Sequence, residues 1–186
     1  FRQITDGFIK EDLGMLHKAE STMRRKREEL KNSRRKEMIG FRKIDPEVAM
    51  EKNTWFHLGR NSCEEILYCL RRIADPCEEH VDNNFVPLSK EQVKEYIPLR
   101  DTVLFLLRRT EKILQTDSYD EVDEVRREAE ELKDCLEKAR EAQMQRMQSS
   151  KENIAVAYLY LNLLQETREL TSSLRHLLRA SKGFRE

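Results

Sequence analysis

The chain has 186 residues, of which 38 % are charged, and its Lys and Arg residues balance its Asp and Glu residues at 35 each. This balance gives no overall positive charge for binding nucleic acid. No apolar run reaches the length of about 20 residues that a membrane-spanning helix needs. Gly and Pro are scarce, at 5 and 4 residues, which disfavours a fold rich in turns and strands. A mean hydropathy of −0.80 is typical of long, mostly exposed helices.

The first helix is expected from about residue 4 to 41, and its second half is strongly charged. We favour a solvated face on which Glu residues one turn away pair with the cations. The other interpretation is a basic patch that contacts an acidic surface, a phosphate-rich ligand or anionic lipid headgroups. The arginines of this patch are Arg24, Arg25, Arg27, Arg34 and Arg35.

The second and third helices begin at recognisable capping residues. Asp45 is followed by proline, so a helix is expected over 46–81, because Asp is a good N-cap and Pro is tolerated in the first helical turn. Ser89 and Gln92 form a capping box for the third helix. Proline removes one backbone hydrogen bond, so this helix either bends at Pro98 or begins there.

The last two helices are expected to start near residues 117 and 150. The fourth is acidic in its first half, where acids favour the helix dipole. Ser149 and Glu152 are expected to cap the fifth, which is too long to be stable without partner helices. Its buried seam advances in alternating steps of four and three residues. The seam is Val156, Tyr160, Leu163, Thr167, Leu170, Leu174, Leu177, Ser181 and Phe184.

Two parts of the chain resemble each other at an offset of 102 to 104 residues. Residues 24–31 resemble residues 126–133, and the seam of the second helix resembles that of the fifth. The paired positions are Phe56 with Tyr160, Ile66 with Leu170, Leu70 with Leu174, Ile73 with Leu177, and Arg71 with Arg175. We therefore expect one all-α domain of about five long antiparallel helices. Residues 1–116 would form a first three-helix bundle, and residues 117–186 a second, incomplete helical hairpin.

Three segments also carry a resemblance to a known family. Residues 70–77, Leu-Arg-Arg-Ile-Ala-Asp-Pro-Cys, resemble the L-E-R-I-G-D-H-A stretch of the PhoU family, whose members are tandem three-helix bundles. Residues 80–88 and 160–179 are similar to the PhoU-like cytoplasmic C-terminal extension of PiT-type inorganic phosphate transporters from Bacteroides-like bacteria. The resemblance spans roughly residues 50 to 186.

The resemblance implies a non-enzymatic regulatory domain on the cytoplasmic side of the inner membrane, with no cofactor. The domain would modulate phosphate uptake through protein–protein contacts, with the membrane-embedded part of its own transporter as its partner. A start at Phe1 rather than at Met agrees with a fragment of such a transporter. Two further partners are left open, a second copy in a homodimer and an anionic membrane surface; nucleic acid is not expected.

PhoU proteins bind metal clusters through acidic E-x-x-x-D pairs, and this chain departs from that pattern. The matching pairs are Arg71 with Asp75 and Arg175 with Arg179, so three of the four positions are basic. A guanidinium cannot ligate a cation, and we expect no metal. The alternative function is a metal-binding, PhoU-type phosphate-signalling regulator. Its ligands would be Asp75, Glu124, Glu128 and Glu131.

The remaining candidate residues also have two interpretations. An anion or partner contact could form from four arginines if the two copies pack symmetrically, although we favour arginines paired with nearby Glu. Cys77 and His80 have the spacing of half a zinc site, but their place on the seam favours a core role. A third function class is a structural coiled-coil dimerisation module. The four arginines are Arg71, Arg72, Arg175 and Arg179.

Overall fold

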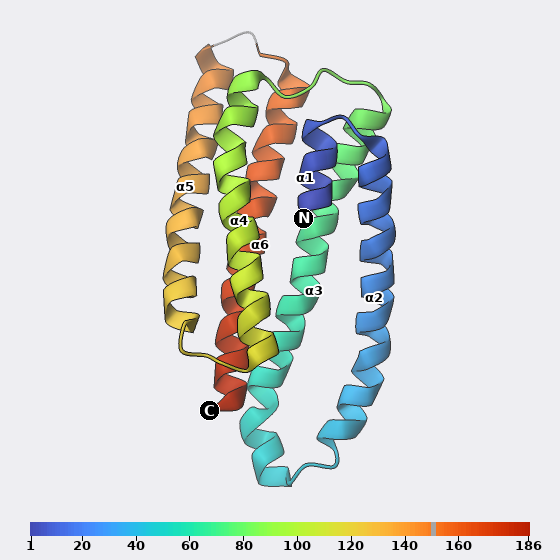
Figure 1. The fold of residues 1–186 in the computed structure, drawn as a ribbon, viewed down its shortest axis with the longest axis vertical. Coiled ribbons are helices and arrows are strands. Elements are labelled where there is room, and N and C mark those ends of the chain that lie inside the picture. Colours follow the sequence, from blue (N-terminus) through green and yellow to red (C-terminus); the bar gives the residue numbers. More distant parts are fainter. Residues whose placement is uncertain (150–151) are drawn as a thin grey trace.

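The expected all-α fold is confirmed by a computed structural model, which describes residues 1–149 and 152–186, the side chains of Arg35, Phe41 and Ser149 excepted. The described residues form six helices and no strand (Figure 1). The helices are α1 (Arg2–Ile9), α2 (Leu13–Phe41), α3 (Pro46–Asp82), α4 (Lys90–Thr116), α5 (Val122–Ser149) and α6 (Ile154–Arg185).

The sixth helix arises because the expected first helix is broken. Glu11 adopts a left-handed conformation with φ of 53°. The amides of Glu11 and Asp12 donate to the carbonyls of Phe8 and Gly7, which is the Schellman arrangement that ends a helix. The Asp12 carboxylate then accepts from the amide of Met15 at 3.0 Å and caps α2. The prediction of one continuous helix was wrong because this left-handed position holds Glu rather than Gly.

The other boundaries follow the sequence in part. The capping box of Ser89 and Gln92 is present, and Pro98 lies inside α4, so the helix begins before the proline. The prediction that Ser149 caps the last helix was wrong, because Ser149 is the last residue of α5. The Asn153 side chain accepts from the amide of Val156 instead and caps α6.

The packing of the six helices has an approximate two-fold symmetry. The antiparallel helices α3 and α6 lie at the centre; α2 packs on α3, and α5 packs on α6. The helix α1 packs on α2 and α3, and α4 packs on α5 and α6, while α1 and α4 also meet. Exchanging α1 with α4, α2 with α5 and α3 with α6 leaves this set of contacts unchanged. In each of these three exchanges the two helices run in opposite directions (Figure 1). The sequence analysis grouped residues 89–116 with the first two helices; the neighbours of α4 are α5, α6 and α1.

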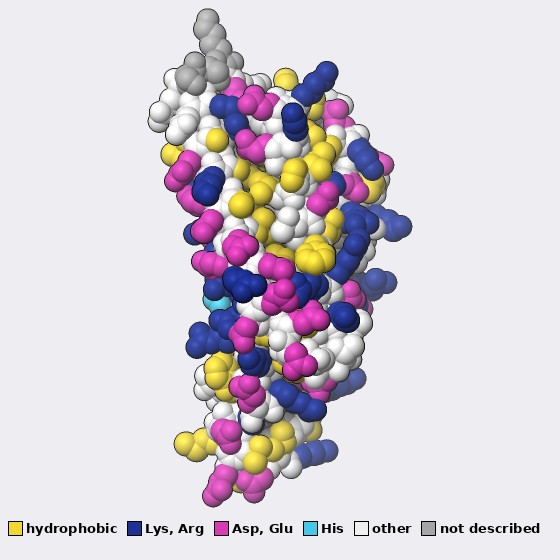
Figure 2. Space-filling model, turned by 60° about the vertical axis from the view of Figure 1, so that its left-hand side comes forward, with side chains coloured by type: hydrophobic (Ala, Val, Ile, Leu, Met, Phe, Trp, Pro, Cys, Tyr) yellow, Lys and Arg dark blue, Asp and Glu magenta, His cyan; other side chains and the backbone are white. Residues whose placement is uncertain are grey.

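All six helices contribute to one hydrophobic core. It includes Ile4 of α1, Leu16 of α2, Cys69 of α3, Tyr96 of α4 and Tyr160 of α6, together with six apolar residues of α5. The expected seam of α6 is buried from Val156 to Leu174. The surface in Figure 2 is mainly polar, with cationic and anionic side chains interspersed along its length and small apolar areas between them.

Candidate functional site

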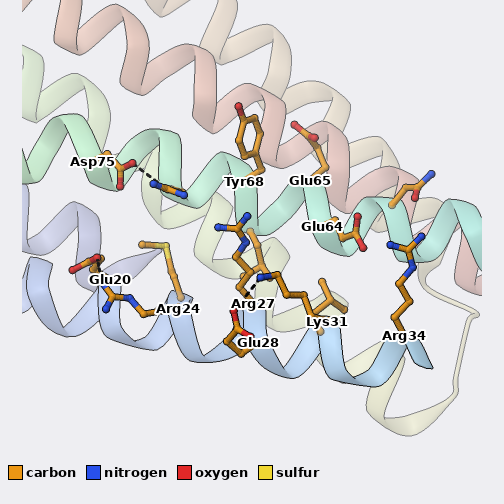
Figure 3. A pocket seen from close by; sticks show the side chains of 15 residues that line it. Glu20, Arg24, Arg27, Glu28, Lys31, Arg34, Glu64, Glu65, Tyr68 and Asp75 are labelled. Carbon is orange, nitrogen blue, oxygen red and sulfur yellow. Dashed lines mark hydrogen bonds and ion pairs between the residues drawn. The ribbon is translucent and has the colours of Figure 1, made fainter. Parts of the chain in front are cut away.

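A groove between α2 and α3 brings together five of the charged residues that the sequence singled out: Arg24, Arg27, Arg34, Arg71 and Asp75. Its volume is about 750 Å³, and no residue of the other helices lines it (Figure 3). Its apolar floor includes Met23, Leu30 and Leu67. The charged and polar lining consists of Glu20, Arg24, Arg27, Glu28, Lys31, Arg34, Asn61, Glu64, Glu65, Tyr68, Arg71 and Asp75.

Three of the five cations of this groove are held by acids on the same helix. The Arg24 guanidinium donates to Glu20 at 2.7 Å, one turn earlier on α2. Lys31 donates to Glu28 at 3.1 Å. The third pair is on α3, where Arg71 donates to Asp75 at 3.0 Å. Such exposed pairs contribute little to stability, and they neutralise these cations toward a ligand.

Arg27 and Arg34 are the two remaining cations of the groove. They lie seven residues apart on α2, which places them two turns, or about 10 Å, apart on one side of the helix. Both extend from α2 toward α3 (Figure 3). Within the described part of the chain neither has an acid within ion-pair distance. Arg25 faces elsewhere and pairs with Glu29 at 3.8 Å, and the side chain of Arg35 is outside the described residues. The expected basic patch is therefore divided, and two of its arginines are directed into the groove without a carboxylate.

Arg72 connects α3 to α6 and does not line the groove. Its Nε donates to Glu166 at 2.7 Å, a second nitrogen donates to Glu65 at 3.2 Å, and its guanidinium lies 4.3 Å from the centre of the Tyr68 ring. Burial opposes the charged form, but the hydrogen bond to Glu166 and the negative charges of Glu166 and Glu65 together outweigh it and raise the pKa of Arg72. The structure thus places Arg72 in an ion pair between the two central helices.

The arginines of α6 lie away from the groove as well. Arg175 forms an ion pair with Glu130 of α5. In the internal repeat Arg175 corresponds to Arg71 and Glu130 corresponds to Glu28, so both arginines face the outer helix of their own hairpin. Arg179 is exposed, with its guanidinium 5.9 Å from the Trp55 ring centre. The four arginines therefore do not converge on one anion.

Sequence reasoning missed Arg60, which joins the two walls of the groove. Its side chain is 9 % exposed and forms ion pairs with Glu37 of α2 and Glu64 of α3. It also donates to the carbonyl of Leu30 at 2.8 Å. The only signal was its position next to Gly59 on the seam of the second helix, where a long cation is unusual. Arg60 fixes the distance between α2 and α3 and so the width of the groove.

The candidate metal ligands fall into separate groups. Glu124 and Glu128 converge with Glu121 on Arg109 of α4, at 2.9 to 3.0 Å. Burial opposes the charge of Arg109, but the hydrogen bonds that it donates to these carboxylates together raise its pKa. Asp75 lies on α3, which does not pack against α5, and Glu131 is exposed on α5. Among the described residues no group of three or more His, Cys, Asp or Glu side chains has an arrangement that could hold a metal ion.

Cys69, Cys77 and His80 have a structural role. Cys77 belongs to the core, as its place on the seam predicted, and Cys69 belongs to the core as well. Burial raises the pKa of Cys69 to about 12 and also raises the pKa of Cys77 and Cys63. The Nε2–H of His80 donates to the carbonyl of Val86 at 2.8 Å and holds the connector between α3 and α4. Raised pKa values disfavour the thiolate that a nucleophile or a metal ligand needs.

Comparisons with known proteins do not assign a function to the chain, so its function is inferred from this geometry. No family model matches the chain, and none of the curated proteins or solved structures compared with it matches either. None of the described helices combines the length and the apolar composition needed to cross a bilayer. The arrangement that the structure does show is an amphipathic groove with two arginines available to an anionic group.

Proposed function

We propose that the chain is a non-enzymatic interaction domain that binds an acidic segment of a partner protein in the groove between α2 and α3. The observation that carries this proposal is the direction of Arg27 and Arg34, which extend into the groove without an acid partner among the described residues. Arginine forms charge-assisted, bidentate hydrogen bonds with carboxylates.

The dimensions of the groove favour a peptide over a small anion. Two arginines that start about 10 Å apart on a helix match the spacing of carboxylates about three residues apart on an extended segment. Met23, Leu30 and Leu67 provide apolar surface between the cations. The segment would therefore carry two acids about three residues apart, with an apolar residue between them.

The biological setting is proposed from the sequence resemblance. The domain would regulate an inorganic phosphate transporter from the cytoplasmic side of the inner membrane, and the acidic segment would belong to the membrane-embedded part. Residues 80–88 and 160–179 support this setting, and the all-helical fold is compatible with it. The net positive charge of residues 24–43, which include the second half of α2, suits a position near anionic headgroups: this stretch has ten cationic residues and three acidic ones.

Peptide binding tests the groove. We expect a fluorescein-labelled peptide with two glutamates three residues apart and a leucine between them to bind with an affinity that falls with salt, since exposed ion pairs are screened. The double variant Arg27→Glu and Arg34→Glu should weaken binding at least about tenfold, at roughly 0.7 kcal/mol for each lost pair. The matched control is Arg108→Glu with Arg127→Glu, which makes the same charge change at exposed positions outside the groove. Equal binding by the two double variants would refute the groove as the binding site.

Phosphate transport tests the setting. The intact protein would be expressed in cells that lack their own phosphate uptake systems, and uptake of radiolabelled phosphate would be measured. The groove variant should change the uptake rate at equal protein level, while the control variant should not. Uptake that is absent with the unaltered protein, or identical in all three, would refute a regulatory role in phosphate transport and leave the peptide result unaffected.

A further inference from the structure

A second groove lies where the two-fold symmetry of the helix packing is incomplete. In the second half of the molecule α4 has 27 residues and covers the hairpin of α5 and α6. Its symmetry partner α1 has 8 residues and covers only part of the hairpin of α2 and α3. Figure 1 shows α1 beside one end of that hairpin and no helix in the equivalent place further along.

The uncovered part of the hairpin has an apolar groove of about 310 Å³. The seams of both central helices, α3 and α6, end in this groove. The end of each seam that is farther from the groove is buried, whereas Cys63 and Leu177 are half-buried and Phe184 is 41 % exposed. A seam with heptad spacing is normally covered by another helix along its length. The main lining residues are Trp55, Phe56, Cys63, Leu177, Ala180 and Phe184.

The internal repeat identifies what covers the equivalent surface in the other half. At an offset of 104 residues Phe56 corresponds to Tyr160, and Cys63 corresponds to Thr167. The hydroxyl of Tyr160 donates to Glu95 of α4 at 2.7 Å, and Thr167 is hydrogen-bonded to Tyr96 of α4 at 3.0 Å. The first half of α4 therefore lies on the surface that is repeated in this groove.

We propose that this groove binds one amphipathic α-helix of a partner protein, which completes a three-helix unit with α2 and α3. The difference between 27 and 8 residues leaves room for about 19 residues, or about 28 Å of helix. Its apolar face would repeat every three to four residues, as in other helices that bind hydrophobic grooves. This partner differs from the acidic segment of the first groove, since it is recognised by apolar contacts.

The probe for this proposal is a fluorescein-labelled peptide with the sequence of residues 89–106, the part of α4 that occupies the equivalent surface. Saturable binding to the unaltered protein, measured by fluorescence anisotropy, is expected, with at least a tenfold loss in Phe184→Glu. The matched control is Phe85→Glu, because Phe85 is 51 % exposed on the connector between α3 and α4. Circular dichroism would establish that both variants are folded. Absence of binding up to about 1 mM peptide, or equal binding by both variants, overturns the proposal.

Two further measurements test which partner occupies the groove. In Cys135→Ser, the half-buried Cys63 is the most accessible thiol, and bound peptide should slow its modification by a maleimide; an unchanged rate at saturating peptide overturns the proposal. Sedimentation of the protein alone tests the competing occupant, a second copy. A concentration-dependent dimer that Phe184→Glu abolishes would assign the groove to self-association and overturn the proposal, whereas a monomer supports it.

Discussion

Replacing Arg72 by methionine is expected to destabilise the protein through Glu166. The Glu166 side chain is 11 % exposed and lies between the two central helices, where Arg72 is its ion-pair partner at 2.7 Å. Methionine keeps much of the apolar stem of the arginine but removes the cation. The carboxylate then remains in a poorly solvated position without this charge, which is unfavourable for folding.

The expected loss lies between the values for exposed and buried ion pairs. Exposed pairs contribute about 0.2–1 kcal/mol, and removal of one partner from a fully buried pair costs about 3–5 kcal/mol. Arg72 is 34 % exposed while Glu166 is nearly buried, so we expect the free energy of unfolding to fall by about 2 kcal/mol. With about 2.1 cal/mol/K of unfolding entropy per residue for 186 residues, the melting temperature should fall by about 5 °C.

Urea unfolding followed by circular dichroism measures this effect. Arg71→Met is the matched control, because the pair of Arg71 with Asp75 is more than half exposed on both sides and its loss should cost less than about 0.5 kcal/mol. In a double-mutant cycle Arg72→Met and Glu166→Met should show a coupling of about 1.5 kcal/mol. Equal stability of the Arg71 and Arg72 variants, or a cycle without coupling, would refute a stabilising ion pair between α3 and α6.

Three further perturbations test the packing. The free energy of unfolding should fall above about pH 9 by up to about 1.4 kcal/mol per pH unit, because burial raises the pKa of Cys69 to about 12 and the folded state keeps a proton that the unfolded state loses; Cys69→Ala should remove this part of the slope in urea titrations. Gly183→Ala should lower the melting temperature, because its Cβ would lie 2.6 Å from the Trp55 ring, whereas Gly40→Ala, with no atom within 4 Å, should not. Arg109→Met should destabilise by about 1–2 kcal/mol, since three carboxylates lose their shared cation; unchanged urea midpoints would contradict that role.

The helix boundaries that the sequence predicted correctly depend on residues within one turn. Asp45 accepts from the amide of Glu47 at 2.9 Å, and Ser89 with Gln92 makes both hydrogen bonds of a capping box. The boundary at Glu11 was missed because a left-handed Glu has no sequence signal comparable to Gly. Asn84 is also left-handed, a conformation that Asn tolerates better than most residues do.

The sequence by itself determined the helical class, the seams and the repeat between the two hairpins, because these are written in spacing and composition. Only the tertiary structure decided that α4 covers the second hairpin and that α1 covers the first in part. It also separated Arg27 and Arg34, directed into a groove, from Arg72, which is paired across 94 residues of sequence. Charge spacing along one helix indicates which cations can pair locally. Pairing with another helix depends on contacts between residues far apart in the chain, and these are fixed only when the helices pack.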